Sequence, residues 1–216
     1  MVRALVVKDL MILRHRLFYS LILVALAVAP MPHEGKRGLL GALFTHMVVT
    51  AFLTQAALLE EQSRGHVLVS LLPVGRRDVV QARYLLLGGL AAATATLYTG
   101  PIAAIAPFVP APIPASTVLL WWLWAATLTM LMWSISLPVV FRWGVTRSQI
   151  LLNSLMFIPF LVLMLLSRWF GAGIQSLARQ GLFSSLPAGL GGLAVAVILA
   201  WVSSVVSTRL YTRRDL

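Results

Sequence analysis

Charged side chains are concentrated between residues 60 and 84 of a chain that is otherwise strongly apolar. Carboxylates open this segment and a second charged group follows the central leucines. The stretches on both sides are long enough to cross a bilayer. A charged connection between two membrane spans is a place where a partner in the aqueous phase can bind a membrane protein. The charged positions that we single out are Glu60, Glu61, Arg76, Arg77 and Asp78.

Catalytic and metal-binding patterns are missing from the sequence. There is no cysteine, which excludes disulfides, thiol chemistry and cysteine-based metal sites. His33-Glu34 lacks the spacing of a zinc-protease helix, and no phosphate loop of the form G-x-x-x-x-G-K-[ST] occurs. We therefore expect no catalytic residue, metal or cofactor in this chain. Energy for uphill transport would have to come from another chain.

Composition indicates an integral membrane protein whose main partner is the lipid bilayer. Hydrophobic residues make up 60% and charged residues 11% of the 216 residues, whereas a soluble domain carries about 25% charged residues. The net charge of +11 does not indicate nucleic acid. In a membrane protein, excess Lys and Arg set orientation and contact anionic headgroups.

Six apolar segments are each near the length that a membrane-spanning helix needs. They show no alternation typical of a membrane barrel, so the predicted fold is all-α, a single transmembrane domain over residues 1–216. The predicted spans are 17–32, 38–59, 84–106, 116–141, 149–167 and 186–207. The third and fourth are joined by a charge-free, proline-rich connection at 107–114, which is predicted to be extended and not helical.

Arginine and lysine predict the orientation of these spans. If the N-terminus lies in the cytoplasm, the segments on the inner side hold most of the 17 Lys and Arg residues, and the outer segments hold only Lys36, Arg37, Arg168 and Arg179. Both termini are therefore predicted to be cytoplasmic, in a multi-pass protein of the inner or plasma membrane.

Residues 1–16 are predicted to form an amphipathic helix on the cytoplasmic surface before the first span. Apolar residues recur along one stripe at helical spacing, and basic residues fill the rest. A frayed basic tail remains the alternative. In the last span, small residues recur every four positions from Ala188 to Ser204, and a similar row runs from Gly88 to Gly100. Such rows favour close helix packing, within one subunit or between two.

Few polar side chains are expected inside the membrane. The predicted spans carry no Asp, Glu, Lys or Arg away from their ends, whereas ion-coupled carriers and proton pumps need such groups in the bilayer. His46, Gln55 and Asn153 are the candidate polar residues of a translocation path. A histidine that is hydrogen-bonded between helices is the other interpretation of His46.

The charged segment contains helix-breaking residues at positions that predict a short helix between two longer ones. Gly65 can break the second span, and Leu68 and Leu71 belong to a short amphipathic turn that Pro73 ends. Gly75 can then act as the N-cap of the next helix. Asp78 follows at the third helical position, where a carboxylate favours the positive end of the helix dipole.

This segment resembles the connection between the second and third spans of ABC type-2 permeases. It reads Glu-Glu-x-x-x-Gly at 60–65 and Val-Ser-Leu-Leu-Pro-Val-Gly-Arg-Arg-Asp-Val-Val-x-Ala-Arg-Tyr-Leu at 69–85. Family members typically have acid-x-x-x-Gly, leucines, Pro-Val-Ser-Arg, an acid and Lys-Tyr. Gly75 stands where Ser is usual, which changes the cap without removing it. The stretches Val-Lys-Asp-Leu-Met-Ile-Leu-Arg at 7–14 and Tyr-Thr-Arg-Arg-Asp at 211–215 are also similar to the family.

The resemblance implies one half of a transporter. The chain would pair with a second permease subunit, identical or related, and would bind two ABC ATPase subunits on the cytoplasmic side. ATP and Mg²⁺ would be bound in the partner ATPase. The cargo would leave through the subunit interface, and an apolar interior would suit hydrophobic or amphipathic molecules. A cytoplasmic coupling helix between spans two and three would transmit the ATPase movement, and its site would be shaped by Glu60, Glu61, Gly65, Leu68, Leu71, Pro73, Arg76, Arg77 and Asp78.

Other interpretations remain open at this point. The charges could belong to a solvated loop whose arginines only set topology. A haem-exporter permease has a similar length and span count, but its charged segment usually carries more Asp and a Leu-Ser-Pro element that is missing here. A membrane scaffold or binding subunit without ATP coupling is a further alternative. A lipid-modifying enzyme is disfavoured because the chain has no acid pair and no metal ligands.

Overall fold

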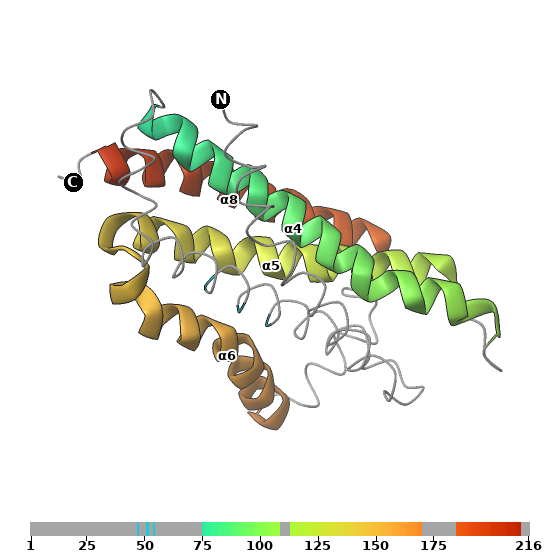
Figure 1. The fold of residues 1–216 in the computed structure, drawn as a ribbon. Helices are drawn as coiled ribbons and strands as arrows, with labels where there is room; N and C mark the ends of the chain where they lie inside the picture. The colour runs from blue at the N-terminus through green and yellow to red at the C-terminus, as the bar shows by residue number, and fades with distance from the viewer. Residues whose placement is uncertain are drawn as a thin grey trace.

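Helices make up the described part of this computed structural model (Figure 1). The structure describes residues 75–108, 113–169 and 185–212, together with positions 47, 51 and 54. Within these residues there is no β-strand, which confirms the all-α prediction there. The elements are α4 (Arg76–Ile105), the 3-10 turn η1 (Ala106–Phe108), α5 (Ala115–Trp143), α6 (Val145–Trp169) and α8 (Leu186–Thr212).

Three of the described helices are long and apolar enough to cross a membrane, namely α4, α5 and α8. They contain the predicted spans 84–106, 116–141 and 186–207, except that residue 106 falls in η1. The predicted span 149–167 lies inside α6, and its crossing of the membrane stays a prediction. Met47, Ala51 and Thr54 are helical, as the span 38–59 requires. The rest of that span, the span 17–32, the surface helix 1–16 and the coupling helix lie outside the described residues.

The helix α5 is the centre of the arrangement. It packs most extensively against α8, and also contacts α4 and α6. Figure 1 shows α4 and α8 side by side above α5, while α6 turns back from the end of α5 and diverges from the bundle. Because α4 runs opposite to both α5 and α8, the first residues of α4 lie at the same end as the last residues of α5 and α8.

The proline-rich connection differs from the expectation at its beginning. Ala106, Pro107 and Phe108 form a 3-10 turn that continues from α4, whereas Ile113 and Pro114 have no helical structure. The fixed φ of proline falls within the range of a 3-10 helix, so Pro107 can stand in a single turn without ending it. Pro114 is extended, with φ −60° and ψ 141°, and is the N-cap residue of α5.

The small residues of α8 allow that helix to approach α5 closely. A Cβ atom at Gly189 would lie 3.0 Å from the Cδ1 atoms of both Leu120 and Leu123. A Cβ atom at Gly192 would lie 3.3 Å from the indole ring of Trp124. These two glycines therefore serve packing within one subunit. The glycines of α4 differ from those of α8. A Cβ atom at Gly88 or Gly100 would meet no described atom within 4 Å.

Candidate functional site

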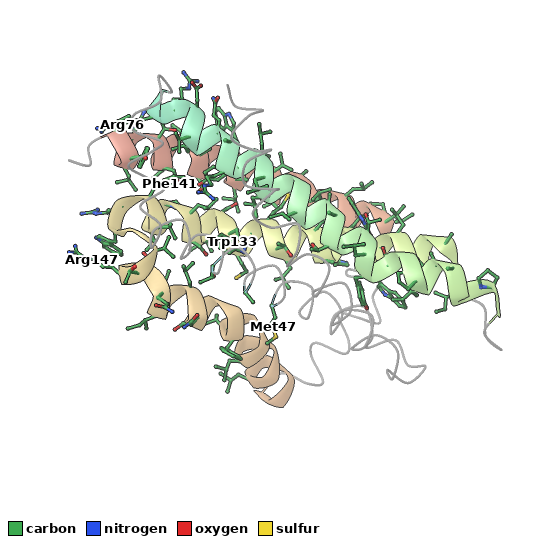
Figure 2. The ribbon with its side chains drawn as sticks, viewed as in Figure 1. Met47, Arg76, Trp133, Phe141 and Arg147 are labelled. Carbon is green, nitrogen blue, oxygen red and sulfur yellow. The ribbon has the colours of Figure 1, made fainter. Side chains whose placement is uncertain are left out.

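One end of the bundle gathers basic side chains from all four described helices. Figure 2 shows Arg76 at the start of α4 and Arg147 at the start of α6 on this side, with Phe141 near the end of α5 and Trp133 further along the same helix. We call this the basic end, and define it by Arg76, Arg77, Arg142, Arg147 and Arg209.

The first turn of α4 has the geometry that its sequence predicts. Gly75 is the N-cap in an extended conformation, and its carbonyl accepts a hydrogen bond from the Asp78 backbone N–H at 2.9 Å. Asp78 is the acidic residue of the first turn, where its negative charge interacts favourably with the positive end of the helix dipole. A Cβ atom at Gly75 would lie 3.3 Å from Oδ2 of Asp78. The absent side chain therefore leaves room for this carboxylate.

Arg76 connects the first turn of α4 to the last turn of α8. Its Nη1 atom donates hydrogen bonds to the carbonyl oxygen of Thr212 at 2.9 Å and to that of Tyr211 at 3.4 Å. The last carbonyls of a helix have no partner within the helix and carry the negative end of its dipole. A guanidinium group satisfies both requirements, and hydrogen bonds from a charged donor are stronger than neutral ones.

A second polar connection joins the same two helices two turns further along α4. The Tyr84 hydroxyl lies 2.6 Å from Oγ of Ser203 and 2.9 Å from Oγ of Ser207. Ser203 donates its hydroxyl proton to the carbonyl oxygen of Ser134 in α5. A serine hydroxyl has one proton to donate, so Tyr84 donates to Ser203 and accepts from Ser207. This chain of hydrogen bonds links α4, α8 and α5.

Apolar packing surrounds these polar contacts at the basic end. A cluster of buried side chains is shared by α4, α5 and α6, with Tyr84, Val140 and Tyr211 packed against it. The ring of Tyr211 in α8 meets the ring of Phe141 in α5 edge to face, with 5.4 Å between their centroids. The buried members are Val80, Leu87, Trp133, Leu137, Phe141, Val145 and Leu152.

The turn between α5 and α6 is tight and held by its own backbone. Gly144 has a φ of 81°, which side-chain-bearing residues rarely adopt, and its N–H donates to the Val140 carbonyl at 2.8 Å. Ser148 Oγ donates back to the Gly144 carbonyl at 2.6 Å. The guanidinium of Arg142 lies over the ring of Trp143 at 5.6 Å, in cation–π geometry.

Polar side chains deeper in the described helices mostly bond to their own helix. Thr94, Thr99, Thr129 and Ser136 each donate to a backbone carbonyl four residues earlier. Thr127 differs, because its buried hydroxyl has no hydrogen-bond partner within the part of the chain that the structure describes. The described residues also contain no group of three His, Asp or Glu side chains that could hold a metal ion.

A hollow of about 510 Å³ lies between α4 and α5 at the end opposite to the basic end. Its lining is mainly apolar, with Val118, Leu119 and Ile113 among its residues. The polar groups are Thr96, Thr99 and the indole of Trp122, whose Nε1 donates to Oγ1 of Thr96 at 2.9 Å.

The predicted site residues are placed only in part. Arg76 and Arg77 are exposed and Asp78 is half-buried, all in the first turn of α4. Asn153 is exposed on α6. The other predicted residues, Glu60, Glu61, Gly65, Leu68, Leu71, Pro73, His46 and Gln55, lie outside the described residues.

Several residues at the basic end were not predicted from sequence. Tyr84, Ser203 and Ser207 form the second connection, while Tyr211 and Phe141 form the ring contact. The signal available beforehand was weak: Ser203 and Ser207 share a helix face, and Tyr84 follows Arg76 by about two helical turns. Nothing local pairs α4 with α8 in this register.

The described helices define a helical, multi-pass membrane protein, and comparison with known families identifies its group. The family model described as ABC-2 family transporter protein matches residues 4–212. The chain belongs to this family, and is therefore a membrane permease subunit of an ABC transporter and a transport subunit that associates with ABC ATPase subunits. No curated protein and no solved structure matched the chain.

Proposed function

We propose that this chain is the membrane-spanning half of an ATP-driven exporter that moves hydrophobic or amphipathic molecules. It pairs with a second permease subunit, identical or related, to form the translocation path. Two ATPase subunits bind on the cytoplasmic side, where they hold ATP and Mg²⁺. The segment around residues 60–78 receives their movement and passes it into the membrane helices.

The observation that supports this role best is the arrangement of the basic end. In the sequence, only Val74 and Gly75 separate Pro73 from Arg76, the first residue of α4. Basic residues are enriched on the cytoplasmic side of membrane proteins. The basic end therefore fits the side on which ATPase subunits bind, and the charged segment emerges there.

The interior of the described bundle supports an apolar cargo. The part of α4 after Arg83, the part of α5 before Arg142 and the part of α8 before Arg209 carry no charged side chain. Most of the deep hydroxyls are occupied by their own backbone, and the hollow near Trp122 is lined mainly by hydrocarbon. A small ion would find no fixed counter-charge along these described helices.

The coupling role is tested by reversing the charges of Glu60 and Glu61 in the purified complex with its ATPase. We expect Glu60→Arg with Glu61→Arg to abolish the stimulation of ATP hydrolysis by cargo, because the carboxylates shape the contact with the ATPase. ATP hydrolysis is measured in proteoliposomes with a panel of amphipathic compounds and small ionic solutes. The amphipathic compounds are expected to stimulate hydrolysis in the unmodified complex.

The matched control is Lys36→Glu with Arg37→Glu, which also reverses two adjacent charges but on the predicted outer side. This control should insert in the membrane and keep stimulated ATP hydrolysis. Unchanged stimulation in the Glu60→Arg, Glu61→Arg variant would contradict the coupling role. Preferential stimulation by the ionic solutes would contradict the proposed cargo class.

A further inference from the structure

We infer that the C-terminal end of α8 is a second moving part of the coupling device, fastened to the start of α4 by Arg76. The inference rests on the proposed function. It assigns a positioning role to Arg76, in addition to any contact that this residue makes with an ATPase. A displacement of the charged segment would then move α4 and α8 together.

The contact made by Arg76 is a cap supplied by one helix to another. Arg76 is the first residue of α4, and it donates to the carbonyls of the last two residues of α8, Tyr211 and Thr212. Arg76 lies more than 130 positions before both acceptor residues in the sequence. Gly75 joins Arg76 to the part of the charged segment that precedes α4. The cap therefore lies where a displacement of that part would reach the first turn of α4.

The second connection makes the two helices move as one body. Tyr84 lies eight residues after Arg76, which is about 12 Å along the helix axis. Its hydroxyl holds Ser203 and Ser207 of α8 at 2.6 Å and 2.9 Å. Two polar connections at different heights resist both sliding and rotation of α8 against α4. A single polar connection would allow α8 to tilt about it relative to α4, within the limits set by the packing of α8 on α5.

The end of α8 also passes movement to α5 and α6. The Tyr211 ring packs edge to face on Phe141, near the C-terminus of α5. Three residues later the chain turns at Gly144 into α6. The Tyr211 backbone carbonyl accepts from Arg76 while its side chain contacts Phe141. This residue therefore joins the α4 cap to the turn between the other two helices.

The test follows the movement of α4 and α8 separately in the purified complex with its ATPase. The chain has no cysteine, so a single environment-sensitive fluorophore can be attached at Gln81→Cys on α4 or at Arg209→Cys on α8. Both positions are exposed in the described structure. The measured quantity is the change in fluorescence on addition of Mg-ATP. In the otherwise unmodified chain, both reporters are expected to respond.

Arg76→Gln removes the positive charge and the guanidinium donor. The α8 reporter response is expected to fall about fivefold or more, in the range of coupling between two sites, while the α4 reporter still responds. Arg76→Lys keeps a charged donor and is expected to restore part of the α8 response. An α8 response that is unchanged in Arg76→Gln would overturn the inference, and so would loss of both responses to the same extent. Absence of any response at Gln81→Cys in the otherwise unmodified chain would instead contradict the proposed function.

A covalent replacement of the cap tests the same inference through a gain of response instead of a loss. In a variant with Arg76→Cys and Thr212→Cys, a short bis-maleimide links the two positions, and a genetically encoded fluorescent amino acid at position 209 reports on α8. The α8 response is expected to be weak before linking and restored after it. A response that linking leaves unchanged would contradict the inference.

Discussion

At the scale of single residues, the most specific feature is the hydroxyl of Tyr84 between two serines of α8. Its hydrogen bonds are 2.6 Å and 2.9 Å long and join segments 119 and 123 positions apart. Ser203 is committed to the carbonyl of Ser134, so Ser207 supplies the proton that Tyr84 accepts. A membrane helix gains little from apolar burial against another helix, because lipid is equally apolar. Specific polar contacts therefore help to set which faces meet.

Ser207→Ala tests this contact. Removal of the hydroxyl is expected to lower the free energy of unfolding by about 1 kcal/mol, the order found for hydrogen bonds between membrane helices. Ser204→Ala is the matched control, because Ser204 lies on the same helix and its hydroxyl bonds to the Trp201 carbonyl of that helix. The measurement is unfolding in mixed micelles with increasing denaturing detergent. Equal effects of the two substitutions would show that the Tyr84 contact contributes nothing specific.

What the sequence could predict at this scale depends on distance along the chain. The capping of α4 by Gly75 and the place of Asp78 were predictable because they involve four consecutive residues and a backbone rule. The Tyr84 contact was not predictable, because it depends on which face of α8 meets α4. The same holds for Arg76: its charge marked it for attention, but its carbonyl partners lie at the other end of the chain.

At the scale of elements, α8 packs on α5 through glycines placed where side chains from α5 arrive. Gly189 is buried and faces Leu120 and Leu123, while Gly192 faces Trp124. The row of small residues predicted a close approach, and the structure identifies α5 as the helix that approaches. The sequence could not choose between packing within one subunit and packing between two, because a small residue does not specify its partner.

Gly189→Val is expected to destabilise the protein by about 1–3 kcal/mol through overpacking, since its Cβ would already lie at 3.0 Å from two leucine methyl groups. Gly191→Val is the matched control. It lies two residues away on the same helix, and its added Cβ would meet no described atom within 4 Å. Thermal unfolding in detergent, followed by circular dichroism, compares the two. A loss of stability in Gly191→Val as large as that in Gly189→Val would contradict packing of Gly189 against α5.

At the scale of the whole molecule, the chain combines apolar helices with one basic end and a charged segment that leads into it. The all-helical class follows from composition alone, because backbone groups in lipid must be satisfied within each segment. Three spans are supported by described helices. The orientation of the basic end rests on charge asymmetry, and the coupling role rests on that orientation. If the basic end faced outward, no cytoplasmic ATPase could reach residues 60–78.

The most direct test is therefore the side of the membrane on which the charged segment lies. Because the chain has no cysteine, Gln62→Cys and Ala111→Cys each introduce a single thiol, in the charged segment and in the proline-rich connection respectively. Intact cells are treated with a membrane-impermeant maleimide before and after permeabilisation. We predict that Ala111→Cys is labelled in intact cells and that Gln62→Cys is labelled only after permeabilisation. Labelling of Gln62→Cys from outside intact cells would contradict the account.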